Sequence, residues 1–139
     1  QIGHQVRTIR RTLTEGESMT FNTLMVDIHP YVNDKVFAEE EGLFGQRLVA
    51  GAFVFSAGIG LVATNWLQAF SYGYDRLRFI KPVHIGDTLK TRVTISDKSD
   101  DPRRPTMGRV IERCEVINQR GEVVLSANHI LLVQRKSAS

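Results

Sequence analysis

The sequence predicts an α+β domain in which a curved antiparallel sheet of about five strands wraps around one long central helix. Two observations predict it. Residues 48–67 are uncharged and rich in alanine, glycine and serine, which is typical of a helix buried on nearly every side. After Tyr72, apolar and polar residues alternate with a period of two as far as Gln134, which is typical of β-strands.

Length and composition favour a single globular domain. At 139 residues, with 42% hydrophobic and 24% charged residues, the chain fits one domain, and we expect it to span residues 1–139. The net charge is only +3 and the arginines are spread along the chain, so nucleic-acid binding is not predicted. The single cysteine, Cys114, excludes an intrachain disulfide and a cysteine-based structural zinc site. Its alternating surroundings indicate a small buried residue.

No targeting or membrane segment is predicted. The first residues, QIGHQVRTIRR, lack the apolar stretch of a secretory signal, so a cytoplasmic location is expected. Residues 48–67 approach membrane-spanning length, but small residues inside the run and the absence of a flanking basic cluster favour a core helix. Neither a metal-ligand constellation nor a phosphate-binding glycine loop is visible, so no metal and no cofactor is expected.

The N-terminal part predicts a strand and a capped helix. Residues 6–13 alternate as an edge or half-buried strand does. Thr14, followed by Glu17 three positions later, is a capping-box pattern that predicts a short helix running through Met25. The apolar positions that fit one face of this helix are Phe21, Leu24 and Met25.

A proline-stiffened turn and a second short helix come next. His29 precedes a proline and is therefore expected to be extended. Asn33 or Asp34 is a suitable cap for a short helix over residues 35–41.

The long helix contains two costly glycines, and four strands follow it. Gly58 and Gly60 each cost about 1 kcal/mol of helix propensity relative to alanine, so close approach of a sheet or of a second subunit is expected to compensate. The strands are predicted as an antiparallel meander, separated by residues typical of turns, over residues 74–82, 88–96, 107–118 and 122–134.

Three stretches, in order and at suitable spacing, resemble the landmarks of one family. They are VDIHPYVND at residues 26–34, FGQRLVAG at 44–51 and KPVHIGD at 81–87. With them the chain resembles the MaoC-like hot-dog proteins, which include the (R)-specific enoyl-CoA hydratases and related dehydratases. The resemblance covers nearly the whole chain after Thr14 and implies the hot-dog fold, with its sheet wrapped around a central helix.

The resemblance also implies a catalytic apparatus. Asp27 falls on the family's catalytic aspartate, and Gly51 on the helix-entry glycine whose N–H binds the thioester carbonyl. The family's catalytic histidine position is Val32 in this chain, and His29 stands where asparagine is usual. Two interpretations of His29 stay open, an assistant in proton transfer and a structural histidine bonded to nearby backbone. Asp27 likewise has an alternative as a turn residue whose carboxylate meets local N–H groups.

Four further residues are expected to bind substrate: Tyr31, Asn33, Ala50 and Ala52. Tyr31 and Asn33 have the alternative of packing or capping. No other histidine or serine shows a catalytic partner pattern, and the GxSxG elbow of serine hydrolases is missing from the sequence.

The sequence therefore predicts a lyase that hydrates an enoyl thioester or dehydrates a 3-hydroxyacyl thioester, with an acyl-CoA-type molecule as its partner. The alternative is a non-catalytic acyl-thioester-binding protein, because Val32 cannot transfer a proton. A thioesterase shares the fold, but the sequence lacks a clear nucleophile pattern for one. A lone sheet of five strands leaves its edges unpaired, so we expect a homodimer, or a higher homo-oligomer, with sheets joined edge to edge and the pocket near the interface.

Overall fold

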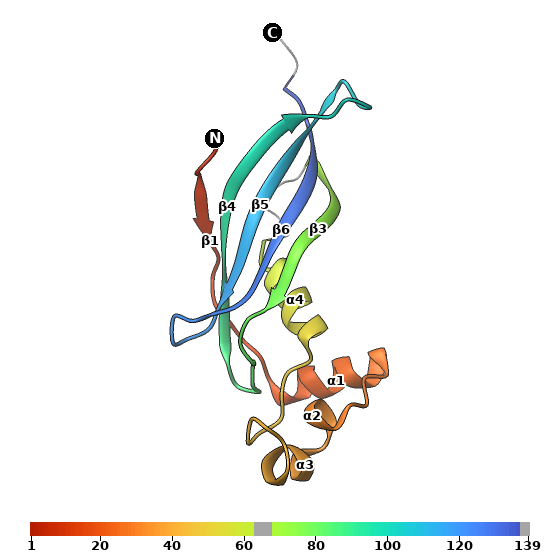
Figure 1. The fold of residues 1–139 in the computed structure, drawn as a ribbon, viewed down its shortest axis with the longest axis vertical. Coiled ribbons are helices and arrows are strands. Elements are labelled where there is room, and N and C mark those ends of the chain that lie inside the picture. The colour runs from red at the N-terminus through yellow and green to blue at the C-terminus, as the bar shows by residue number, and fades with distance from the viewer. Residues whose placement is uncertain (63–67, 137–139) are drawn as a thin grey trace.

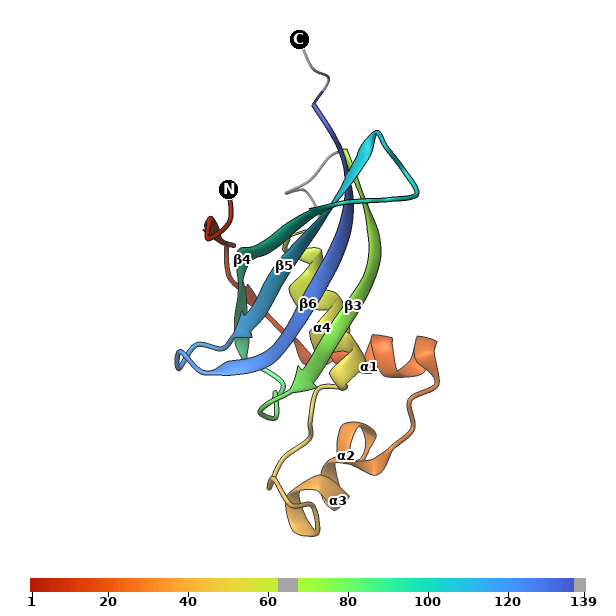
Figure 2. The same ribbon diagram turned by 45° about the horizontal axis from the view of Figure 1, so that its top comes forward.

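A computed structural model of the chain describes residues 1–62 and 68–136. Its main element is an antiparallel sheet with the strand order β1-β4-β5-β6-β3, and a short β2 also pairs with β4. The strands are β1 (Gln5–Arg7), β2 (Arg11–Thr12), β3 (Ala69–Phe79), β4 (Thr88–Asp100), β5 (Met107–Ile117) and β6 (Val123–Gln134). Helix α4 (Gly51–Gly60) lies inside the curve of the sheet (Figure 1). Three further helices gather at one end of the sheet, α1 (Glu15–Met25), α2 (Pro30–Asn33) and α3 (Lys35–Glu40) (Figure 2).

The predicted α+β arrangement is confirmed, but the sheet has six strands where about five were expected. The additional strand arises because the expected strand over residues 6–13 is interrupted between β1 and β2. Here the Thr91 N–H donates to the hydroxyl of Thr8 at 2.9 Å, and the Thr8 N–H donates to the Thr91 carbonyl at 2.9 Å. A side chain thus replaces a backbone acceptor in the ladder, and the prediction of one continuous strand was wrong.

Strand β3 begins earlier than its alternation pattern suggested. The expected range was 74–82, whereas the strand spans Ala69–Phe79. Gly73 lies inside the strand, at a register shift between Ser71 and Gly73. Glycine inside a strand commonly marks such a bulge, and this one keeps the edge strand paired with β6.

Helix α4 is shorter than predicted. It begins at Gly51, because the chain before it is extended: Leu48 forms a bridge with His84, and the Val49 N–H donates to the Val83 carbonyl at 2.7 Å. The helix ends at Gly60, and residues 63–67 of the expected range lie outside the described residues. The prediction of burial on nearly every side was also wrong, because one side of the helix is exposed at Ala52, Ser56 and Gly60.

The predicted caps of the short helices are confirmed. The Thr14 hydroxyl accepts the Glu17 N–H at 3.2 Å, and the Glu17 carboxylate accepts the Thr14 N–H at 3.4 Å, completing a capping box at the start of α1. Of the two candidate caps for the next predicted helix, Asp34 is the one used: its Oδ1 accepts the Phe37 N–H at 2.9 Å at the start of α3.

The buried face of α1 is more polar than the sequence suggested. Phe21 stacks on Phe53 of α4 with the ring centroids 5.1 Å apart, as an apolar face requires. Leu24 and Met25, expected on the same face, are 69% and 60% exposed, whereas Asn22 is buried. Asn22 is buried because its side chain bonds to the segment after the helix, and this contact positions the candidate site described below.

The main core lies between α4 and the concave face of the sheet. Its fully buried side chains include Leu13, Val116 and Leu125. Cys114 is fully buried in a second cluster nearby, as the sequence predicted. Burial, and secondly the nearby Glu112, raise the pKa of the Cys114 thiol to about 12. Among the described residues, no helix has the length and apolar character that crossing a membrane would require.

The two glycines of α4 stand in different surroundings. A Cβ at position 58 would lie 2.5 Å from Val116 Cγ2 on β5, and Thr91 Oγ1 donates to the Gly58 carbonyl at 2.9 Å. The expected close approach of the sheet is therefore found at Gly58. A Cβ at Gly60 would meet nothing within 4 Å.

Because only Gly58 is packed tightly against the sheet, a Gly→Ala substitution is predicted to change the free energy of unfolding in opposite directions at positions 58 and 60. Gly58→Ala should lower the free energy of unfolding by about 1–3 kcal/mol, because the added methyl group overpacks the helix–sheet contact. Gly60→Ala should raise it by about 0.5–1 kcal/mol, because alanine loses less conformational entropy in a helix. Urea unfolding followed by circular dichroism measures both values. Equal effects of the two substitutions would contradict the packing described at Gly58.

Candidate functional site

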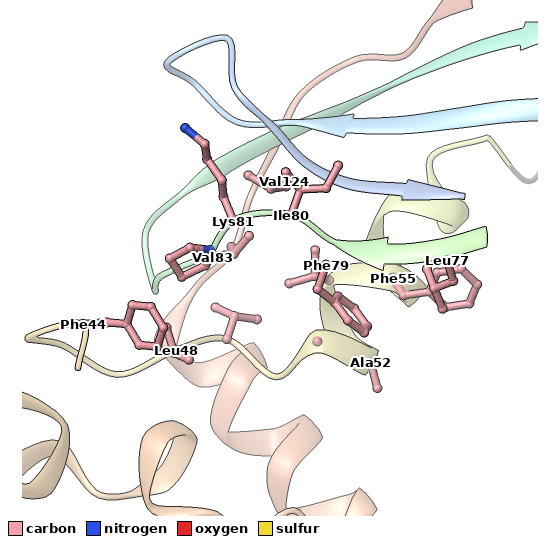
Figure 3. Close-up of a pocket in the computed structure, with 14 residues that line it drawn as sticks. Phe44, Leu48, Ala52, Phe55, Leu77, Phe79, Ile80, Lys81, Val83 and Val124 are labelled. Carbon is pink, nitrogen blue, oxygen red and sulfur yellow. The ribbon is translucent and has the colours of Figure 1, made fainter. Parts of the chain in front are cut away.

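A large apolar cavity opens beside the N-terminus of α4. Its volume is about 810 Å³, and it lies between the first turns of the helix, the end of β3 and the segment that follows β3. Figure 3 shows Ala52 and Phe55 on the helix opposite Leu77 and Phe79 on the strand. Among the described residues that line the cavity, Lys81 is the one with a charged side chain. Such a lining suits an acyl chain or another largely apolar ligand.

Unpaired backbone donors stand at one side of this cavity. Gly51 and Ala52 are the first two residues of α4, and both line the cavity. The residue before them, Ala50, provides no side-chain cap, and within residues 1–62 and 68–136 no backbone acceptor receives these two N–H groups. The first N–H groups of a helix lack intrahelical partners and carry partial positive charge. The geometry therefore offers hydrogen bonds to a carbonyl oxygen that gains negative charge.

Glycine at position 51 leaves room for the Phe79 ring beside the helix start. A Cβ there would lie 2.9 Å from Cε1 of the Phe79 ring. The ring therefore packs directly against the backbone of residue 51, in a position that any other residue would obstruct. Phe79 is a wall of the cavity that the sequence did not single out, because period-two alternation does not show which strand ends beside the helix.

Lys81 is held by ion pairs beside the cavity. Its Nζ pairs with the carboxylate of Glu122, which also accepts a hydrogen bond from Arg120 at 2.8 Å. Hydrogen bonds from Lys81, Arg120 and Asn118 lower the pKa of Glu122 to about 2. Because Glu122 has a second cationic partner, Lys81 can turn to an anionic ligand without leaving that carboxylate unpaired.

Asp27 lies in the loop between α1 and α2, outside the residues that line the cavity. Its backbone is held on both sides: its N–H donates to the Asn22 carbonyl at 2.9 Å, and its carbonyl accepts from Asn33 Nδ2 at 2.8 Å. Asn22 also donates to Asn33 Oδ1 at 3.2 Å. The Asp27 carboxylate accepts the His29 N–H at 3.4 Å, a turn contact of the kind considered above as the alternative. Asn33 thus positions the loop.

His29 caps α2, a helix that the sequence did not predict. It is extended, with φ −62° and ψ 134°, as expected before a proline, and its Nδ1 accepts the Tyr31 N–H at 3.2 Å. The imidazole is exposed and stacks on the Tyr31 ring with centroids 5.3 Å apart. This arrangement supports the structural interpretation of His29. Asparagine, which is usual at this position in the resembled family, is also a strong helix cap.

The loop borders the cavity wall through Tyr31. The Tyr31 ring meets Phe44, a cavity residue, with centroids 6.0 Å apart, and the Tyr31 carbonyl accepts the N–H of Leu48, another cavity residue, at 2.8 Å. Phe44 and Leu48 appear side by side in Figure 3. His29, which stacks on Tyr31, is therefore linked to the cavity wall through that ring.

Two of the predicted site residues, Gly51 and Ala52, line the cavity, and Ala50 is buried at the helix start. Asp27, His29, Tyr31 and Asn33 are brought together with one another, but not into the cavity of the single chain. Val32, at the position where the family has its catalytic histidine, is buried in the main core. Asn22 was missed because a buried asparagine in a helix has no local pattern.

The family model described as MaoC like domain matches residues 1–115. The chain belongs to this family. Protein MaoC of Klebsiella aerogenes is 40% identical over 101 residues, which cover 71% of the chain and 30% of that protein. Mesaconyl-CoA hydratase of Cereibacter sphaeroides is 28% identical over 134 residues, which cover 94% of the chain and 38% of that protein. The chain thus spans about a third of the length of these curated relatives.

Solved structures confirm the predicted fold. A monoamine oxidase regulatory protein from Archaeoglobus has a TM-score of 0.90 at 32% identity, with 98% of this chain and 92% of that chain covered. A Mycobacterium tuberculosis protein with a double hotdog fold has a TM-score of 0.83 at 20% identity, with 100% and 44% covered. The second likeness shows the fold alone. The MaoC-like chain therefore has the hot-dog fold that the sequence landmarks implied.

The capping role of His29 predicts that alanine and asparagine at this position change the free energy of unfolding by different amounts. His29→Ala should lower the free energy of unfolding by about 0.5–2 kcal/mol, because the Tyr31 N–H loses its acceptor. His29→Asn should leave it unchanged within about 0.5 kcal/mol, because asparagine is also a strong cap. Urea unfolding measures both, with His4→Ala as the control at another exposed histidine. Equal losses in the alanine and asparagine variants would contradict the capping role.

Proposed function

We propose that this MaoC-like protein hydrates an enoyl thioester, or dehydrates the corresponding 3-hydroxyacyl thioester, with an acyl-CoA-type molecule as substrate. The observation that carries the proposal is the uncapped start of α4, where the Gly51 and Ala52 N–H groups border an apolar cavity of about 810 Å³. This combination suits a thioester whose carbonyl oxygen must bear developing charge while its acyl chain lies in an apolar space. A curated relative that is a mesaconyl-CoA hydratase supports the same chemistry.

In this proposal Asp27 is the general base. It takes a proton from water as the water oxygen bonds to the β-carbon of the enoyl group, and the thioester oxygen becomes an enolate that accepts the Gly51 N–H. The protonated Asp27 then returns its proton to the α-carbon, so one carboxylate completes the reaction and no histidine at position 32 is required. His29 positions the loop by capping α2, and Asn33 holds its backbone.

A second copy of the chain is proposed to complete this site. The residues around Asp27 are apolar and uncovered in the single chain: Val26 is 74% exposed and Ile28 is 76% exposed. The unpaired edge of β3 also exposes Phe70 at 71%. Pairing of two copies along β3 satisfies the free strand edge, and we propose that it also covers the loop and brings Asp27 to a water-excluded cavity.

Lys81 is the proposed contact for the phosphates of the carrier. It is a charged residue in a lining that is otherwise uncharged over the described part of the chain, and an exposed ammonium there attracts a phosphorylated ligand. Arg103 and Arg104, which are basic as well, lie in the β4–β5 hairpin at the opposite end of the sheet from α1–α3 (Figure 1). Asp101 accepts hydrogen bonds from both of these arginines.

The alternative function, a non-catalytic binder of acyl thioesters, is favoured by one observation. Val32 packs in the core, so the imidazole that the resembled family uses has no counterpart at that position. Calorimetric binding of an acyl-CoA without turnover of any enoyl thioester would support this alternative over the lyase.

The lyase proposal predicts the effect of two substitutions on hydration of crotonyl-CoA, measured as loss of the enoyl absorbance. Asp27→Asn should lower kcat by about 10²–10⁴-fold, because the base is removed at nearly constant shape. Gly51→Ala should lower kcat/KM by about 10²-fold or more, because the methyl group displaces the Phe79 ring and obstructs the donor. Gly60→Ala, the same change in open space on the same helix, is the control and should keep the activity. An Asp27→Asn protein as active as the wild type would refute the proposed mechanism.

The proposed pairing of two copies along β3 predicts that a substitution at this strand edge gives a monomer. Phe70→Glu should convert the dimer to a monomer and lower activity in parallel, because a charge would be buried at the β3 edge. Ile9→Glu, at an 81% exposed residue between β1 and β2, is the matched control and should remain dimeric. Sedimentation analysis measures both, and a wild-type chain that is monomeric and fully active would contradict the proposed role of the second copy.

A further inference from the structure

A second group of chemically capable side chains lies under the other end of α4. Glu112 and Cys114 are two residues apart on β5 and so share one face of the sheet, and His129 on β6 is paired directly with Glu112. All three residues are buried. One ligand atom from each, a carboxylate oxygen, Sγ and a ring nitrogen, lies within 4.8 Å of the other two.

The imidazole of His129 is held in one orientation. Ser71 Oγ lies 2.7 Å from Nε2, and the Tyr74 ring stacks on the imidazole with centroids 4.3 Å apart and an interplanar angle of 6°. The opposite nitrogen, Nδ1, is buried and makes no hydrogen bond within the described residues. It points toward Glu112, whose Oε2 lies 3.6 Å away. A buried ring nitrogen without a hydrogen-bond partner is expensive unless something binds it.

We propose that Glu112, Cys114 and His129 bind one divalent transition-metal ion of the zinc class. Thiolate, imidazole and carboxylate are the three ligand types that Zn²⁺ accepts, at about 2.3, 2.0–2.1 and 2.0–2.2 Å. The tetrahedral angle then places neighbouring ligand atoms about 3.3–3.6 Å apart, which matches the Nδ1–Oε2 distance of 3.6 Å. The three ligand atoms lie within 4.8 Å of one another, so small side-chain movements bring them onto one ion.

The local chemistry fits such an ion in two further respects. A metal-bound histidine usually bonds its other nitrogen to a neighbouring group, and Ser71 is that partner for Nε2. On binding, the S–H bond of Cys114 breaks, a sulfur–metal bond forms and the proton passes to the buffer. A thiolate and a carboxylate then balance the charge of a divalent ion, so the buried site is neutral as a whole.

A separate cavity gives access to the cluster. It has a volume of about 270 Å³ and is lined by Ser71, Tyr74, Glu112 and His129, together with apolar residues such as Ile59 at the end of α4. The cavity provides a path for the ion and space for a water molecule as fourth ligand. Three protein ligands with one open position are the arrangement of a catalytic or exchangeable metal site rather than of a closed structural one.

Ser71, His129 and Glu112 do not form the catalytic triad of a serine hydrolase. That chemistry requires the Nδ1–H of the histidine to donate to the carboxylate while the serine donates to Nε2. At 3.6 Å the Nδ1–Oε2 separation exceeds a hydrogen bond, so the carboxylate does not orient the imidazole for this purpose.

The test is a titration of the full chain, stripped of metal with EDTA, with Co²⁺ as a spectroscopic probe. We expect one ion per chain, with visible bands of low-symmetry cobalt and an ultraviolet thiolate-to-cobalt band, both lost when Zn²⁺ is added. Cys114→Ser should abolish the thiolate band, and Glu112→Gln should weaken binding by about tenfold or more. His84→Gln, which changes a histidine outside the cluster, is the control and should bind as the wild type does.

Several results would overturn the proposal. They are the absence of stoichiometric binding to a folded wild type, a titration unchanged in both ligand variants, or a cobalt spectrum without a thiolate band. Labelling of Ser71 by a fluorophosphonate would also overturn it, since it would assign the cluster to nucleophilic chemistry. The readout is spectroscopic and needs no turnover of an enoyl thioester, so the outcome is independent of the lyase proposal.

Discussion

Helix α4 can lie as close to the sheet as it does because residue 58 has no side chain. Val116 on β5 occupies the space that a Cβ would need. The Thr91 hydroxyl on β4 donates a hydrogen bond to the Gly58 carbonyl. This contact fixes the position of the helix on the concave face. The N-terminal end of the helix then borders the large apolar cavity, and its C-terminal end covers the cluster of Glu112, Cys114 and His129. Both candidate sites depend on this one packing contact.

In the proposed function, the chain gives up some stability at the start of α4 in exchange for ligand binding. Replacing a serine, threonine or aspartate cap by alanine typically costs about 1 kcal/mol, and Ala50 stands at the cap position. A side-chain cap would have used the N–H groups that a ligand carbonyl requires. Gly51 has a complementary role, because its missing Cβ lets the Phe79 ring and a ligand approach the same backbone atoms. In the proposed function the glycine at position 51 serves recognition, whereas the glycine at position 58 serves packing.

Local patterns in the sequence identified the features that depend on neighbouring residues. The capping box at Thr14 follows from hydrogen-bonding types, and the structure confirms it. The predicted four-strand meander is confirmed for β4 to β6 but was wrong for β3, which pairs with β6 instead of β4. The exposure of Leu24 could not be predicted, because it follows from Asn22 bonding to a later segment instead of an apolar contact. The interruption between β1 and β2 depends on the Thr8 side chain meeting Thr91, far away in sequence.

The candidate sites also combine features that the sequence predicts with features that only the tertiary fold produces. The landmarks of the resemblance located Gly51 at the helix start, but Phe79 and Lys81 join the cavity only through the tertiary fold. Glu112 and His129 stand opposite each other because of the register between β5 and β6, which alternation alone does not fix. The interpretation of His29 was left open by the sequence, and the short helix α2, which it caps, supports the structural alternative.

The apolar residues beside Asp27 connect the proposed chemistry to assembly. Fully burying a valine or isoleucine side chain contributes about 1.5–3 kcal/mol, so covering Val26 and Ile28 with a second copy favours association. The same contact removes water from around the loop, and exclusion of water strengthens the attraction between a developing oxyanion and a backbone N–H. In the proposed dimer, apolar residues that are exposed on an isolated chain therefore become the walls of a dry site. A chain with this loop has reason to keep it apolar even though the loop itself contributes little to the monomer's core.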